Sequence, residues 1–216
     1  MGTIVPMSSG SAADFLPARR TLATLRKAAA HCRGCDLYKD ATQTVFGEGN
    51  PHAIAMFVGE QPGDQEDREG HPFVGPAGKL LHDAMRAAKI SADDVYITNA
   101  VKHFKFVWRG KRRIHAKPKR IEVRACEPWL VEEIAQIRPQ LVVALGATAA
   151  QALLGPTFRI TERRGELVES AYAERVVATV HPSSILRARD DDSRRVEMAA
   201  FVDDLRIVAD LMRSPA

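Results

Sequence analysis

The sequence predicts an α/β protein whose parallel sheet of four strands is covered by helices on both faces. Four short apolar runs have the length and the unbroken hydrophobicity of strands that are buried on both sides. Helical patterns separate these runs, and strands that alternate with helices build parallel sheets. Polar side chains also stand where three of the strands end. The four runs span residues 53–59, 95–101, 141–146 and 176–181.

The bulk composition is that of one globular domain. The chain has 216 residues, of which 45% are hydrophobic, so a full core is available. No apolar run approaches the roughly 20 residues that cross a bilayer, and residues 1–11 lack a secretory pattern. We therefore expect a cytoplasmic monomer with no membrane partner. Because the number of cysteines is 3, a disulfide scaffold is not expected.

The amino-terminal part begins with small and polar residues. We expect residues 1–17 to form a flexible tail and residues 18–216 to form a single domain. Apolar residues at helical spacing predict a helix over residues 20–31, followed by a loop over residues 40–50. A second amphipathic pattern predicts a helix over residues 77–89.

An acidic, glycine-rich segment leaves the carboxyl end of the first strand. It runs from Gly59 to Asp67, and Phe73 follows it closely. In open α/β sheets, ligands bind outside the carboxyl ends of the strands. Glu60 would supply a base there, and Gln61 a polar group that reads a ligand. The alternative is an acidic surface loop.

A basic segment follows the second strand. Between Lys102 and Lys119 there are 8 lysines and arginines, 2 histidines and no acidic residue. The segment is too charged for a core element and too long for a simple turn, so we expect an inserted loop at about residues 104–119. Concentrated positive charge beside a ligand edge favours a polyanion as partner. The alternative is a solvated basic loop.

The remaining elements follow the same alternation of helix and strand. Helices are expected over residues 120–137, 147–154 and 193–212, with an irregular or hairpin region over residues 159–169. Neither a GxGxxG motif nor a P-loop follows any strand, so no nucleotide cofactor is indicated. Because parallel strands end at one edge, we expect Glu60, Gln61, Asn99 and His181 to meet in one site.

The three cysteines indicate a metal centre. Cys32 and Cys35 form a CxxC pair, and Cys126 lies much later in the chain. A zinc ion or a [4Fe–4S] cluster normally takes four ligands, so a fourth is needed. We choose His103, although His31 or a non-protein ligand would also serve. The spacing does not separate zinc from iron–sulfur, and a reduced CxxC with an unrelated Cys126 is the remaining alternative.

Taken together, these motifs resemble the iron–sulfur members of the uracil-DNA glycosylase superfamily. Within that superfamily the chain is most similar to the UdgX branch, which links itself covalently to uracil-containing DNA. Three features carry the second resemblance: Gln61 after Glu60, the basic run Lys111–His115, and His103 in place of a cysteine. The resemblance to the superfamily as a whole rests on five motifs that occur in this order: CxxC, Gly59–Gly63, Pro72–Gly75, Ile97–Lys102 and His181–Ser183.

The resemblance implies the fold and the cofactor. The fold would be an α/β/α sandwich with a four-stranded parallel sheet. A [4Fe–4S] cluster would be held by Cys32, Cys35, His103 and Cys126, with a structural rather than a redox role. Zinc is the alternative at the same ligands.

The resemblance also assigns a uracil pocket. A glycosylase reaches C1′ only after the nucleotide leaves the base stack. Phe73 would stack on the flipped uracil beside Gly59 and Gln61, and Asn99 would read its N3–H and O4. His181 would stabilise the negative charge on O2 as the glycosidic bond breaks. Taken singly, Phe73 is equally at home in a core, Asn99 in a turn, and His181 at a strand end.

In the UdgX branch a histidine takes the place of the attacking water. Here His115 would attack C1′ through a ring nitrogen, and Glu60 would accept or orient its proton. Gln61 would fix Glu60 or the backbone of the inserted loop. A neutral imidazole is nucleophilic near pH 7, which suits the role. Free uracil and a stable histidine–deoxyribose adduct would be the products of a single turnover.

The partner implied is uracil-containing DNA, single-stranded or double-stranded. Two alternatives remain: a glycosylase that turns over many times, in which His115 only supports binding, and a non-catalytic DNA-binding module with a zinc site. Phosphate contacts would make the affinity depend on salt. They are expected from Lys111, Arg112, Arg113, Lys117 and Lys119. Ser183, Ser184 and Arg187 are also expected to bind DNA, with Arg187 inserting where uracil leaves the base stack; a plain surface arginine is the alternative for Arg187.

Overall fold

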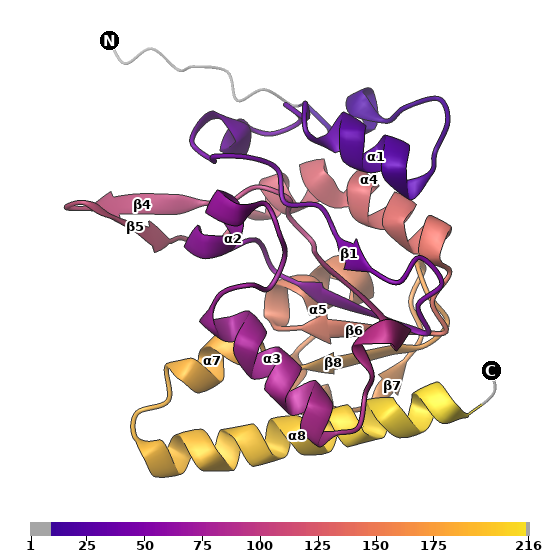
Figure 1. Cartoon of the computed structure of the whole chain (residues 1–216), viewed down its shortest axis with the longest axis vertical. Helices are drawn as coiled ribbons and strands as arrows, with labels where there is room; N and C mark the ends of the chain where they lie inside the picture. The colour runs from indigo at the N-terminus through magenta and orange to yellow at the C-terminus, as the bar shows by residue number, and fades with distance from the viewer. Residues whose placement is uncertain (1–9, 215–216) are drawn as a thin grey trace.

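The computed structural model describes residues 10–214, which form a central sheet between two layers of helices (Figure 1). The sheet has 6 strands in the order β1-β3-β2-β6-β8-β7. The inner strands β3, β2, β6 and β8 are parallel, whereas β1 and β7 pair antiparallel at the two edges. The strands are β1 Glu48–Gly49, β2 Ala55–Gly59, β3 Val95–Asn99, β6 Leu141–Leu145, β7 Leu167–Val168 and β8 Val176–Thr179.

The parallel core of the predicted sheet is confirmed, but the number of strands is not four. The two edge strands, β1 and β7, are each 2 residues long. An element of that length has no alternating pattern to detect, because a strand is recognised by side chains that repeat every second residue. Its pairing with the sheet becomes visible only in three dimensions.

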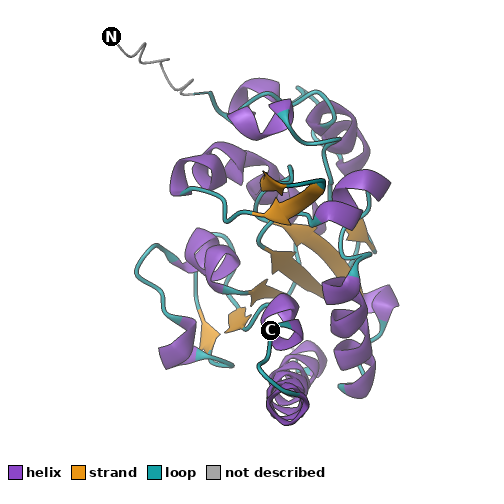
Figure 2. Ribbon diagram, turned by 90° about the vertical axis from the view of Figure 1, so that its left-hand side faces the viewer, coloured by secondary structure: helices purple, strands orange, loops and turns teal. Residues whose placement is uncertain are grey.

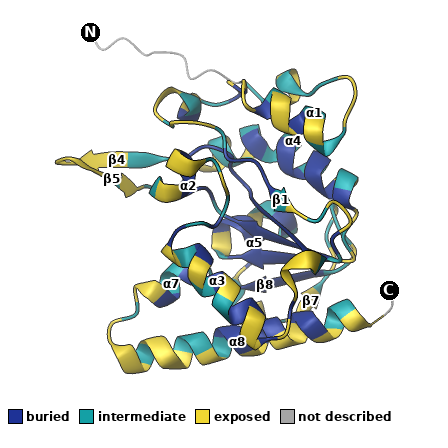
Figure 3. Cartoon of the chain, viewed as in Figure 1, coloured by how far each residue is buried: buried dark blue, intermediate teal, exposed yellow. Residues whose placement is uncertain are grey.

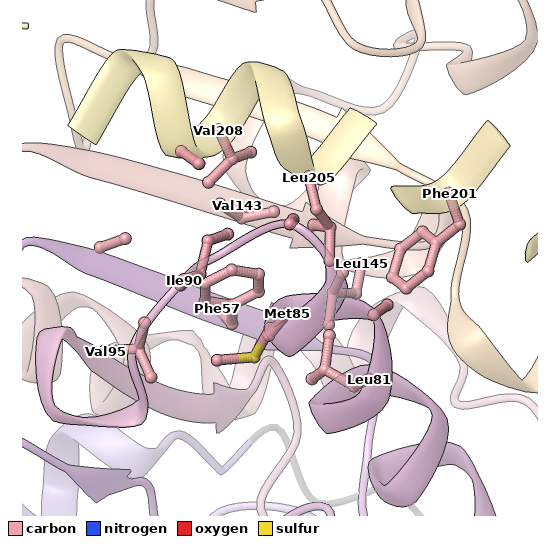
Figure 4. Packing of buried hydrophobic residues seen from close by; sticks show 14 of the residues in the cluster. Phe57, Leu81, Met85, Ile90, Val95, Val143, Leu145, Phe201, Leu205 and Val208 are labelled. Carbon is pink, nitrogen blue, oxygen red and sulfur yellow. The ribbon is translucent and has the colours of Figure 1, made fainter. Parts of the chain in front are cut away.

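Helices cover both faces of the sheet (Figure 2). Alternate residues of the inner strands point to opposite layers, as expected for strands that are buried on both sides. Phe57 and Val143 pack towards α3 and α8 (Figure 4), whereas Met56 and Val142 pack towards α4 and α5. The helices concerned are α3 Pro76–Ala87 and α8 Asp191–Arg213 on one side, with α4 Arg120–Ile137 and α5 Ala147–Leu154 on the other.

Two segments that we expected to be loops contain regular structure. The acidic segment forms the short helix α2, Asp64–Glu69, in which three carboxylates lie in the first turn and favour the positive end of the helix. The basic segment forms a hairpin of β4, Phe106–Arg109, and β5, Arg112–His115, which projects from the body of the molecule (Figure 1). These two strands were not predicted, because neither face of the hairpin is wholly apolar and the sequence therefore lacks the alternation of apolar and polar residues that indicates a strand.

The amino-terminal segment packs onto α4 and does not hang free from residue 10 onward. A 3-10 helix covers Ala12–Phe15, and Ala12 is fully buried. Residues 1–9 of the expected tail lie outside the described residues. The helix α1, Leu22–Ala29, joins the same small core, which also contains Cys32, Cys126 and Trp129.

The shorter remaining elements connect this framework. They are the 3-10 turns at Asp36–Lys39 and Ala92–Asp94 and the helices α6 Ile160–Arg163 and α7 Pro182–Leu186. The irregular region expected over residues 159–169 therefore contains α6 and β7. Within residues 10–214, no helix is long and apolar enough to span a bilayer.

Candidate active site at the carboxyl edge of the sheet

A cavity of about 840 Å³ opens where the inner parallel strands end. The loops after β2, β3, β6 and β8 and the end of β5 all contribute side chains to it. The polar strand-end residues that we expected to meet therefore do so. The lining includes Glu60, Gln61, Phe73, Asn99, Ile114, His115, Lys117, Thr148, His181, Ser183, Ser184 and Arg187.

Gly59, Phe73 and Asn99 form a narrow slot in this cavity. Gly59 and Asn99 are direct partners in the β2–β3 register. A Cβ atom on Gly59 would lie 2.3 Å from Asn99 Oδ1 and 2.6 Å from Phe73 Cζ, so only glycine fits between them. Asn99 is 2% exposed, and its Oδ1 has no hydrogen-bond partner among the described residues. The slot thus presents an unused acceptor to a flat ring that carries an N–H group.

Phe73 is held in place by an unusual backbone conformation. Its φ angle is 54°, in the left-handed region that bulky side chains rarely adopt. A Cβ on Gly78 would lie 1.7 Å from the Phe73 carbonyl oxygen, so the start of α3 approaches this strained peptide closely. The Phe73 ring lies 6.0 Å from the His181 ring, centroid to centroid. Backbone strain of this kind collects at functional sites, which supports a ligand role for the ring.

Glu60 is an ionised carboxylate held by two neighbours. Thr148 Oγ1 donates to its Oε2, and His115 Nε2 lies 3.2 Å from its Oε1. Burial by itself would raise the pKa of Glu60, but the hydrogen bonds from His115 and Thr148 outweigh burial, and the pKa ends below its ordinary value. A charged carboxylate is therefore ready to orient the His115 ring and to take a proton from it.

His181 is oriented as a neutral hydrogen-bond donor. It is the residue before α7, and the Ser183 backbone N–H donates to its Nδ1 over 3.1 Å. The ring proton of a neutral imidazole must then lie on Nε2, the other ring nitrogen. Burial lowers the pKa of His181 to about 4, so the ring stays neutral at physiological pH. It can donate to an oxygen that gains negative charge in the cavity.

Gln61 fixes the hairpin at its base. Its side-chain amide donates to the carbonyl oxygens of Lys105 at 3.0 Å and Ala116 at 3.2 Å. Its Oε1 accepts the backbone N–H of Lys105 at 3.2 Å. These two residues flank β4 and β5. We expected Gln61 to fix either Glu60 or the backbone of the inserted loop. Its hydrogen bonds go to the backbone of the inserted loop.

Arg113 anchors the same hairpin to α2. Its side chain is 8% exposed, donates to Asp67 Oδ2 at 2.6 Å, and also pairs with Asp64. Its guanidinium lies 5.1 Å from the centroid of the Phe106 ring. These contacts occupy the guanidinium, so it is not available to the DNA phosphates that we expected it to contact. Arg113 instead holds the hairpin that carries His115.

The other basic residues remain available for a polyanion. Lys111 and Arg112 are exposed on the hairpin, whose tip has the colour of exposed residues in Figure 3. Lys117, Ser183, Ser184 and Arg187 line the rim of the cavity. Lys119 is exposed at the start of α4. Because Lys117 and Arg187 line the cavity itself, an anion that enters it meets positive charge.

The cysteines lie together in the small core beneath α1 and α4. Cys32 and Cys126 are buried, and Cys35 packs against the same cluster. Cys32 and His103 line one hollow of about 200 Å³. Within residues 10–214, no three His, Cys, Asp or Glu side chains come close enough to hold a single ion. A cluster spaces its ligands more widely than one ion does, because each ligand binds its own iron.

The surroundings of the thiols suit an iron–sulfur cluster. Burial raises the pKa of Cys126 to about 12 and also raises the pKa of Cys35, so the thiolates need bound cations to form. The backbone N–H of Lys102 donates to Cys126 Sγ at 3.2 Å, and Trp129 Nε1 donates to Cys32 Sγ at 3.3 Å. Hydrogen bonds to sulfur are typical of such clusters. The donor set fits the group.

Sequence reasoning missed several residues that shape the site. Thr148 lies in the first turn of α5, directly after β6, the one inner strand whose end carried no reactive side chain in our prediction. Glu66 accepts the backbone N–H of Gly75 at 2.8 Å and of Gly63 at 3.0 Å, which ties two walls of the cavity together. Glu66 belongs to the acidic run that we considered as a possible surface loop. Its structural role follows from its burial, which the sequence does not show.

Comparisons with known proteins agree with this geometry. The model of the uracil DNA glycosylase superfamily matches residues 46–206. A type-4 uracil-DNA glycosylase from Thermotoga maritima is 39% identical over 166 residues, which cover 76% of this chain and 83% of the relative. One from Pyrobaculum aerophilum is 36% identical over 164 residues, or 73% and 80% of the two chains. A type-5 uracil-DNA glycosylase from Pyrobaculum aerophilum is 35% identical over 154 residues, or 63% and 64%.

Proposed function

This chain belongs to the uracil-DNA glycosylase superfamily, and from that premise we propose that it excises uracil from DNA and then stays attached to the abasic sugar through His115. The observation that carries the proposal is the position of His115. It reaches the cavity from the end of an inserted hairpin, with Nε2 at 3.2 Å from Glu60 Oε1. An imidazole therefore stands beside the carboxylate that would otherwise activate water.

Uracil recognition follows from the slot of Gly59, Phe73 and Asn99. The unpaired Asn99 Oδ1 accepts the uracil N3–H, and the amide nitrogen donates to O4. Cytosine has no hydrogen on N3 and would leave the buried oxygen unpaired, which is costly. The Phe73 ring stacks on the base. Because Gly59 has no Cβ, Asn99 and Phe73 can approach each other closely enough to contact the same base.

His181 stabilises the leaving group. As the C1′–N1 bond breaks, the bonding electrons leave with uracil, and negative charge develops on its O2. The neutral ring donates from Nε2 to that oxygen, since the Ser183 backbone N–H already occupies Nδ1. A donor that is already oriented before the reaction lowers the barrier, because it needs no rearrangement when the charge develops.

His115 then completes the reaction. A ring nitrogen uses its lone pair to form a bond to C1′ of the sugar cation, and Glu60 accepts the proton that the ring loses. Free uracil is released, and the chain remains covalently bound to DNA. Gln61 and Arg113 place the ring, because they hold the hairpin that carries it. On this basis we propose that the chain is a member of the UdgX branch. One chain supplies every residue, so we propose a monomer.

We also propose a [4Fe–4S] cluster held by Cys32, Cys35, Cys126 and His103. When bound, it holds the amino-terminal segment against α4 and takes no part in bond breaking. His103 Nε2 lies 2.9 Å from Thr44 Oγ1, a partner that orients the ring. Zinc at the same residues is the alternative, and metal analysis of the purified protein decides between them.

The test is a heated denaturing gel of the protein with an end-labelled uracil-containing oligonucleotide. We expect a slow band that needs uracil and survives heat, and peptide mapping that finds the sugar on His115. A His115→Ser variant should lose the band and release uracil instead, because water fills the vacated space. Alkali-labile free DNA from the wild type would establish a turnover glycosylase. No uracil release by either protein would refute the proposal.

A further inference from the structure

Trp108 is exposed at the tip of the basic hairpin. Its side chain is 66% exposed, and it is the one aromatic among the large apolar residues at the surface of residues 10–214. Exposing an indole to water is unfavourable by itself. An aromatic surface among positive charges is a feature of proteins that bind single-stranded nucleic acid, because bases stack on the ring and phosphates pair with the charges.

The indole stands at the end of a fixed row of aromatic rings. Phe104 is buried, and its ring stacks on Phe106 with centroids 5.2 Å apart. The Phe106 ring meets Trp108 edge-on at 5.4 Å. Directly across the hairpin from Trp108 stands Arg113, which Asp64 and Asp67 hold to α2. These contacts hold the Trp108 ring in place, so little conformational entropy of its side chain would be lost when a ligand binds.

The position of Trp108 relative to the nucleophile is set by the hairpin register. His115 pairs with Phe106, and Trp108 follows two residues later on the same face. Such diagonal neighbours lie about 7–8 Å apart. Successive nucleotides of a strand are about 3.4 Å apart in a stacked duplex and more in an extended strand. A ring at that separation from His115, the residue that would attack the sugar, is close enough for a nucleotide one or two places along the chain.

The charges around the indole favour DNA over a protein partner. Arg109, Lys111 and Arg112 surround the tip, and the segment from Lys102 to Lys119 has no acidic residue. The ion pairs of this segment involve Lys102, Lys105, Arg113 and His115. Within residues 10–214 none involves the three basic residues at the tip, so their charges remain for phosphates.

From these observations we propose that Trp108 is a stacking platform for an unpaired base next to the flipped uracil. This inference rests on the proposed function and deepens it. In a duplex, a base beside the flipped uracil is still paired with the opposite strand and stacked on its far neighbour, so it can turn towards Trp108 only after its base pair opens. The platform therefore makes uracil in single-stranded DNA, with at least one unpaired neighbour, the preferred substrate.

The first experiment compares Trp108→Ala with Val107→Ala. Val107 is 56% exposed and lies next to Trp108 on the opposite face of the hairpin, so it is a matched control. Loss of one base–aromatic stack corresponds to roughly a 5- to 150-fold loss of affinity. We expect a loss in that range for Trp108→Ala in the second-order rate on single-stranded uracil DNA. We expect a change within about 2-fold for Val107→Ala, and little effect of either change on duplex DNA.

A second experiment locates the stacked base. A tetrahydrofuran spacer replaces the base at each position flanking uracil in turn. At one position the missing base should slow the wild type about as much as Trp108→Ala does, and should cost that variant nothing further, because both changes delete the same contact. Coupling at no position, equal losses on single and double strands, or an equal loss in Val107→Ala would each overturn the inference.

Fluorescence provides a readout that does not depend on catalysis. The chain has 2 tryptophans, and the other one, Trp129, is fully buried. Binding of an oligothymidine without uracil should quench Trp108, and Trp108→Phe should abolish the signal while anisotropy shows near-normal affinity. If the wild type neither captures nor releases uracil, the proposed function fails, and this assay still decides on the platform. Normal uracil chemistry with no effect of Trp108→Ala refutes the platform alone.

Discussion

The substitution Gly59→Ala tests where uracil lies. The added Cβ would stand 2.3 Å from Asn99 Oδ1 and 2.6 Å from Phe73 Cζ. A carbon needs about 3.3 Å to an oxygen and about 3.5 Å to another carbon, so each group must retreat by about 1 Å. The backbone of Asn99 cannot move far, because it belongs to β3 and its main-chain carbonyl oxygen accepts a hydrogen bond from Lys102 Nζ at 2.7 Å. The displacement therefore falls on the Asn99 side chain, which carries Oδ1.

The expected loss of activity follows from this displacement. A shift of 1 Å in a group that positions substrate reduces the rate by about 100-fold. Overpacking should lower the free energy of unfolding by about 1–3 kcal/mol, or roughly 2–12 °C in Tm for a chain of this size. The assay is the single-turnover rate of uracil loss from a saturating single-stranded oligonucleotide, with Tm measured on the same sample.

A matched glycine separates stability from the pocket. Gly155 has φ of 96° with no atom within 4 Å of an added Cβ, so Gly155→Ala strains the backbone far from the slot. We expect that variant to lose stability and keep its rate. If Gly59→Ala reacts at the wild-type rate, the slot formed by Gly59, Phe73 and Asn99 does not hold the base, and our assignment of Asn99 fails.

Three further predictions concern the hairpin, the pH and the cysteines. Gln61→Ala should slow covalent capture more than uracil release, so the ratio of free abasic DNA to adduct rises, whereas Gln65→Ala, in an exposed pair with Glu69, should leave the ratio unchanged. The pKa of His181 is about 4 in the folded chain, below the ordinary 6.5, so the unfolded chain binds more protons between these two pH values. The free energy of unfolding, measured in urea, should therefore fall as the pH drops from about 6.5 towards 4. The variant His181→Asn should lessen that fall. Excision by the folded chain should fall only as the pH approaches about 4, where His181 becomes protonated and can no longer act as the neutral donor. Cys126→Ser should abolish the visible iron–sulfur absorbance and lower Tm, and a colourless wild type with bound zinc would contradict the cluster.

The parallel core could be predicted because each inner strand is hydrophobic on both faces. Phe57 faces one helical layer and Met56 the other, so β2 reads as an unbroken apolar run whichever layer is considered. The helices α4 and α5 begin and end as predicted, because their apolar periodicity stops at Arg138 and Gly155. The edge strands escaped detection, since pairs of residues carry no period.

The site was predictable as a set of strand ends but not as a set of contacts. Parallel topology brings Glu60, Asn99 and His181 to one edge, so their chemistry could be combined from sequence. Arg113 was different. Its neighbours in sequence are basic, yet its partners Asp64 and Asp67 come from another segment, 49 and 46 residues away. Contacts between segments so far apart follow no local pattern, which is also why Thr148 was missed.

In the proposed mechanism, the hairpin both binds DNA and carries the nucleophile, His115. Its base is tied by Gln61 and by the pair of Lys105 with Glu122 at 2.8 Å, and its middle is tied by Arg113. A histidine on a free loop would visit C1′ rarely, and water would react first. The three anchors keep one ring nitrogen at Glu60 before substrate arrives. In the proposed mechanism, capture in place of hydrolysis depends on this rigidity, so Gln61 and Arg113 should affect the yield of adduct although neither forms the bond to the sugar.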